Sequence, residues 1–65
     1  MTTEIGFKFK PTFPSNIDHF EVRGYDDEKG EVLTTVYPKN GHTFNDSIDR
    51  MHYDAAFEIG EYVPL

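Results

Sequence analysis

The sequence contains neither cysteine nor tryptophan, and it is poor in basic residues. Without cysteine the chain forms no disulfide and no thiolate metal site, so neither can reinforce a domain of 65 residues. A chain of this size buries only about 60% of the surface that its unfolded form exposes, which leaves a thin margin of stability. We therefore expect a single domain over residues 1–65, in a reducing cytoplasm and without a cofactor.

Positive charge and long apolar runs are both scarce. Six Lys and Arg residues oppose twelve Asp and Glu residues, which gives a net charge of −6 and a pI near 4.7. This balance argues against direct binding to nucleic acid or to an anionic membrane. Apolar runs of at most three residues exclude a membrane span. The expected partner is therefore a protein.

Aromatic residues are abundant by contrast, at 15% of the chain. Each buried aromatic ring removes roughly 150–250 Å² from water, so a few of them can supply a small core. They also occur in periodic patterns along the whole length, which predicts a folded chain despite a mean hydropathy of −0.61.

Alternation of apolar and polar residues predicts three strands. The segments Glu4–Lys10, Ile17–Tyr25 and Glu31–Tyr37 each place apolar residues at every second position. Residues 26–30 (DDEKG) between the last two suit a hairpin turn in which Gly30 takes a left-handed conformation. This hairpin is the clearest structural prediction that the sequence allows.

Prolines mark the connection after the first strand. Pro11 and Pro14 cannot donate to a sheet ladder, so the first strand should end before them, with Phe13 packed beneath the connection.

The apolar period changes after the turn at 38–41 (PKNG). We predict a helix over about Phe44–Ala56, with Thr43 and Asp46 as its capping box. Gly60 should stop any continuation, and residues 57–63 could be helix, edge strand or tail. The stripe expected to face the core comprises Phe44, Ile48, Met51, Ala55 and Ile59.

The fold class that follows is α+β. We expect a small antiparallel sheet of three to four strands, built around the central hairpin, with one amphipathic helix packed on one face.

Catalytic and metal-binding motifs do not stand out. No nucleophile elbow, phosphate-binding loop or zinc-binding helix motif occurs, so we predict no enzyme. His42, Asp49 and His52 could converge on a divalent ion. Polar residues at the surface and a helix-capping aspartate explain them better in a chain without cysteine or an H-x₃-H pattern, and we predict no metal site.

The charge distribution is the most informative feature. Residues 18–31 and 41–65 each carry a net charge of −4, whereas residues 1–17 and 32–40 each carry +1. Carboxylates four residues apart on a helix are separated by about 6 Å along its axis, a spacing near that of successive phosphates. Tyr53 and Phe57, if exposed among these acids, would anchor a protein partner, with Tyr25 and Tyr37 on the sheet as substitutes. The acids of this predicted partner-binding site are Asp46, Asp49, Asp54, Glu58 and Glu61.

A second group of acids lies at the predicted hairpin tip. It lacks the spacing of a calcium-binding loop, so we interpret it as a secondary acidic patch. Its members are Asp26, Asp27, Glu28 and Glu31.

In size and charge the chain resembles phage-encoded DNA mimics such as uracil-DNA glycosylase inhibitors. The resemblance covers no alignable stretch and assigns no residue roles. It implies an inhibitor or regulator that occupies the basic site of a nucleic-acid-binding protein. Two alternatives stay open: a self-associating structural or accessory subunit, such as a homodimer joined through a sheet edge, and a metal-dependent sensor or enzyme.

Overall fold

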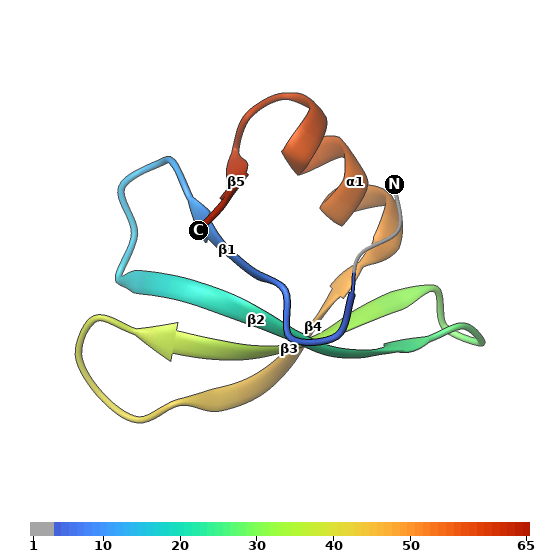
Figure 1. Cartoon of the computed structure of the whole chain (residues 1–65), viewed down its shortest axis with the longest axis horizontal. Coiled ribbons are helices and arrows are strands. Elements are labelled where there is room, and N and C mark those ends of the chain that lie inside the picture. The colour runs from blue at the N-terminus through green and yellow to red at the C-terminus, as the bar shows by residue number, and fades with distance from the viewer. Residues whose placement is uncertain (1–3) are drawn as a thin grey trace.

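The computed structural model describes residues 4–65 as one antiparallel sheet and one helix (Figure 1). The sheet has five strands in the order β4-β3-β2-β1-β5, and every neighbouring pair is antiparallel. The helix lies between β4 and β5 in sequence and covers one face of the bent sheet (Figure 1). The elements are β1 (Lys8–Pro11), β2 (Ile17–Asp26), β3 (Glu31–Pro38), β4 (Phe44–Asp49), α1 (Arg50–Glu58) and β5 (Tyr62–Pro64).

The predicted hairpin is confirmed as β2 and β3. The turn between them ends on Gly30, whose φ of 65° is the left-handed conformation that glycine adopts without steric cost. β1 starts later than predicted, because the chain turns at Gly6 and becomes a strand only from Lys8.

The predicted helix start is wrong: residues 44–49 form an edge strand. Phe44, Asp46 and Ile48 lie opposite Val36, Thr34 and Val32 of β3, with polar residues between them on the other face. Asn, Asp and Ser compete for backbone hydrogen bonds and disfavour helix, so pairing with β3 prevails.

The helix begins after Asp49, not after the expected capping box at Thr43. The Asp49 carboxylate accepts the backbone N–H groups of Met51 at 3.1 Å and of His52 at 3.4 Å. At the other end Gly60 stops the helix as predicted. Its N–H donates to the carbonyl of Phe57, and the N–H of Glu61 donates to the carbonyl of Ala56, which is a Schellman motif.

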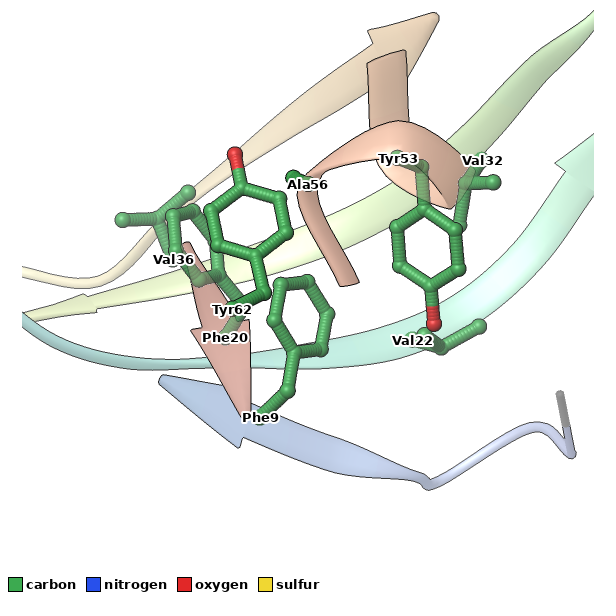
Figure 2. Close-up of a cluster of buried hydrophobic side chains, with 8 residues drawn as sticks. All are labelled: Phe9, Phe20, Val22, Val32, Val36, Tyr53, Ala56 and Tyr62. Atoms are coloured by element: carbon green, nitrogen blue, oxygen red, sulfur yellow. The ribbon is translucent and has the colours of Figure 1, made fainter. Parts of the chain in front are cut away.

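The helix buries a different face from the one expected. Tyr53 and Ala56 are 4% and 2% exposed, whereas Met51 and Ile59 are 81% and 69% exposed. With its first six residues in β4, the helix is too short for the long apolar stripe to define its inner face. Figure 2 shows the Tyr53 ring reaching from the helix toward Val22 on the sheet.

The core is a cluster of rings and branched side chains between helix and sheet (Figure 2). Phe9 is at its centre, with ring centroids 4.9 Å from Phe20, 5.0 Å from Tyr62 and 5.3 Å from Tyr53. The buried set is Phe9, Phe20, Val22, Val32, Thr34, Val36, Tyr53, Ala56 and Tyr62.

The α+β class is confirmed, with an antiparallel sheet and one helix on it. The expected three to four strands are five, because residues 44–49 form β4 and the uncertain segment 57–63 ends in the short edge strand β5.

Candidate interaction surface

The tip of the β2–β3 hairpin meets the start of the helix. The backbone N–H of Arg50 donates to the carbonyl of Gly30 at 2.8 Å. The guanidinium of Arg50 lies 3.9 Å from a carboxylate oxygen of Asp27 and 5.6 Å from the centre of the Tyr25 ring. The tertiary structure therefore joins two acidic segments that are separate in the sequence.

This junction concentrates negative charge. Glu31, the first residue of β3, lies directly opposite Asp49, the last residue of β4, so the helix cap adjoins the hairpin tip. Lys29 and Arg50 are the cations of this region, against five carboxylates. We call the group the acidic corner: Asp26, Asp27, Glu28, Glu31 and Asp49.

The outward face of the helix extends from the acidic corner. Asp54 and Glu58 follow Arg50 at intervals of four residues, so they lie near one face of the helix, and both are exposed. Beside them Met51, Ala55 and Ile59 form an exposed apolar row at the same spacing. We call Met51, Asp54, Ala55, Glu58 and Ile59 the outer helix face.

The expected anchors do not lie on this surface. Tyr53 is in the core, so the exposure that its anchoring role required is absent. Phe57 is half-buried against the core, with its ring centroid 5.2 Å from Phe9 and 4.9 Å from Tyr53. Neither ring lies on the acidic surface, because both pack between the helix and the sheet.

Two of the predicted site acids lie apart from the acidic corner. Asp46 is on the sheet face that bears the core, opposite Thr34, whose hydroxyl donates to the Asp46 carbonyl at 3.3 Å. Glu61 follows the C-terminal end of the helix, where its carbonyl accepts the N–H of Thr12 at 2.8 Å. The structure thus groups Asp49, Asp54 and Glu58 with the hairpin tip and leaves Asp46 and Glu61 aside.

The position of Asp46 also bears on self-association. β4 is an edge strand of the sheet, and such edges invite pairing with another chain. A charged side chain directed to the inner face of an edge strand disfavours that pairing, because pairing would bury the charge. The β4 edge is therefore poorly suited to a homodimer.

Tyr37 makes polar and stacking contacts on the sheet face opposite the core. The Tyr37 hydroxyl donates to a Glu21 carboxylate oxygen at 2.8 Å, and the Tyr37 ring stacks on His19 at 4.4 Å. The hydrogen bond to Glu21, with desolvation and the carboxylate charge, raises the pKa of Tyr37 above 10.0. Burial raises the pKa of Tyr62 in the core.

No metal site is assembled among residues 4–65. No three potential ligands there could together hold a metal ion, so His42, Asp49 and His52 do not form the trio considered from the sequence. Within the same residues no helix is long and apolar enough to cross a membrane.

The sequence also contains features that predict the outer helix face, but the helical spacing of apolar residues from Phe44 to Ile59 indicated a different one. Asn45, Asp46 and Ser47 disfavour helix, and Asp49 is a possible cap, so together they would have shortened the helix and turned Met51 outward. Comparisons with protein-family models, characterised proteins and solved structures give no match.

Proposed function

We propose that this protein is a small acidic protein-binding module of the cytoplasm, which inhibits or regulates a nucleic-acid-binding protein by occupying its basic surface. One observation carries the proposal. The contact between Arg50 and the hairpin tip brings the acidic corner and the outer helix face together on one side of the molecule. Complementary fields of this kind accelerate encounter with a basic surface and orient the two partners.

An acidic surface alone would serve solubility equally well. The apolar row of Met51, Ala55 and Ile59 distinguishes the two roles, since a purely solubilising helix gains nothing from exposing it. Methionine is enriched in interfaces, where apolar contacts exclude water around charged pairs. In this proposal Met51 and Ile59 take the anchoring role that the sequence suggested for Tyr53 and Phe57, and Asp54 and Glu58 flank them.

The test is capture from a cytoplasmic extract by the immobilised chain, with elution by salt and by competing duplex DNA. We expect a nucleic-acid-binding protein in stoichiometric amount, released by both. Binding should fall in Asp54→Asn/Glu58→Gln and in Met51→Ala/Ile59→Ala.

The matched control is Glu4→Gln/Asp18→Asn. It removes the same formal charge from exposed positions outside the acidic corner and the outer helix face, and it should retain binding. Equal loss in both neutralised variants would show that only net charge matters and would overturn the proposal. Capture of nothing but copies of the chain itself would also overturn it, in favour of a self-associating subunit.

A further inference from the structure

The two positively charged segments of the chain meet at the end of the molecule opposite the acidic corner. The backbone N–H of Lys39, in the β3–β4 connection, donates to the carbonyl of Asn16, in the β1–β2 connection, at 2.7 Å. These two connections lie side by side at the left of Figure 1, and the hairpin tip lies at the right. β2 joins the two ends and spans about 30 Å at 3.3 Å per residue. A binding event here is therefore separate from the proposed function.

A hollow of about 580 Å³ opens at this end. Its volume falls within the range of roughly 300–1,000 Å³ that small-molecule sites occupy. Lys10 and Lys39 both line it, with Pro11 and Ile17 as apolar lining and Phe13 at 47% exposure. Phe13 is not packed beneath the connection as expected, and among residues 4–65 it makes no ring contact with another aromatic side chain.

The wall that carries Phe13 is held in place by hydrogen bonds. The N–H of Thr12 donates to the Glu61 carbonyl at 2.8 Å, and its hydroxyl donates to the Gly60 carbonyl at 2.7 Å. The Ser15 hydroxyl oxygen accepts the N–H of Ile17 at 3.1 Å. Pro11 and Pro14 further restrict the backbone between them. A ligand would thus meet a largely preformed surface, at a reduced entropic cost of ordering.

The charges of the lining favour an anion. Asp18 is the carboxylate of the hollow, and its oxygen is hydrogen-bonded to Nδ1 of the neighbouring His19. Lys10 and Lys39 have no carboxylate within ion-pair distance among residues 4–65, so both ammonium groups can receive an anionic ligand. The exposed Phe13 ring and the apolar lining suit an aromatic body attached to that anionic group.

We propose that this hollow binds small aromatic molecules bearing a phosphate or a carboxylate. The anionic group lies between Lys10 and Lys39, and the aromatic body packs on Phe13. Phenyl phosphate and benzoate are the probes, because each pairs one anionic group with one ring. Benzyl alcohol lacks the charge, and inorganic phosphate lacks the ring.

The experiment is a titration of the ¹⁵N-labelled chain, monitored by amide chemical shifts. We expect saturable shifts at residue 39 and at the non-proline residues among 10–18 with at least one of the two probes, and the stronger binder identifies the anionic group. Lys10→Gln or Lys39→Gln should weaken binding about tenfold, the effect of losing one charge-assisted hydrogen bond. Phe13→Ala should weaken the binding of both probes and leave the binding of inorganic phosphate unchanged.

Lys29→Gln is the matched control, since it removes the same charge at the hairpin tip. An equal effect in this variant would show a nonspecific response to net charge and would overturn the proposal. Saturation by benzyl alcohol with equal affinity would overturn it as well, as would no saturable shift with either probe at millimolar concentration. Amide spectra of the free variants establish that each is folded.

Discussion

The orientation of the helix can be tested by truncating the side chains on its two faces. In the structure Met51 and Ile59 are exposed, whereas Tyr53 is buried against Phe9 and Phe57. We predict that Met51→Ala/Ile59→Ala changes the free energy of unfolding by no more than about 0.5 kcal/mol per site, as for ordinary surface positions. Tyr53→Leu should clearly lower the free energy of unfolding.

The magnitudes separate the two orientations. Each aromatic pair contributes about 0.5–1.5 kcal/mol beyond its buried area, so losing the pairs of Tyr53 with Phe9 and Phe57 costs about 1–3 kcal/mol. At 4–8 °C per kcal/mol for a domain of this size, Tm falls by about 4–24 °C. With Met51 and Ile59 in the core, truncating both would cost about 4–10 kcal/mol. That range matches the whole expected stability of the domain, about 3–10 kcal/mol at 0.05–0.15 kcal/mol per residue.

Urea unfolding followed by far-ultraviolet circular dichroism measures these differences. Tyr53→Phe serves as the control, because it keeps the ring and removes only the hydroxyl. The assigned orientation is refuted if Met51→Ala/Ile59→Ala destabilises the chain as much as Tyr53→Leu does. The same double variant, once shown to be stable, is the reagent for the capture experiment.

Three further perturbations address the cap, the sheet surface and the hairpin turn. Asp49→Ala should lose about 1 kcal/mol of stability in thermal melts, whereas Asp49→Asn, an equally good cap, should lose much less; equal losses would mean that charge and not capping matters. Glu21→Gln should lower the pKa of Tyr37, measured from tyrosinate absorbance. Because the folded-state pKa is raised, the stability from this contact is present below pH 10.0 and is lost as the pH rises through the folded pKa; an unchanged tyrosine titration would count against the contact. Gly30→Ala should lower the free energy of unfolding in urea by about 1–2 kcal/mol. An added Cβ would contact no neighbouring atom, so this loss comes from the positive φ at residue 30. An unchanged free energy would show that the turn has rearranged.

Local chemistry in the sequence determined the central hairpin, its turn and the end of the helix. Alternation over β2 and β3 specifies which side chains face inward, since successive residues of a strand point to opposite faces. Gly30 and Gly60 are two of the four glycines with positive φ, and they lie where the hairpin turn and the helix end require a left-handed residue. The negative net charge, and with it the expectation of a basic partner, also required no structure.

Only the tertiary structure decided where β4 ends and which face of the helix is buried. The apolar residues from Phe44 to Ile59 fit a helical period, but pairing with β3 takes the first six residues into the sheet. The remaining helix has only nine residues, so its buried face is set by the few side chains that contact the sheet. Tyr53 is buried because its ring packs against Phe9.

The grouping of charges was likewise beyond the sequence. The contact of Arg50 with Gly30 joins two acidic segments, and the contact of Lys39 with Asn16 joins two basic ones. Both contacts link residues distant along the chain, so no local pattern encodes them. The sequence by itself determined how much charge the protein carries. The sheet decided that the five carboxylates of the acidic corner lie at one end and Lys10 and Lys39 at the other, because the antiparallel register of its strands dictates which connections become neighbours.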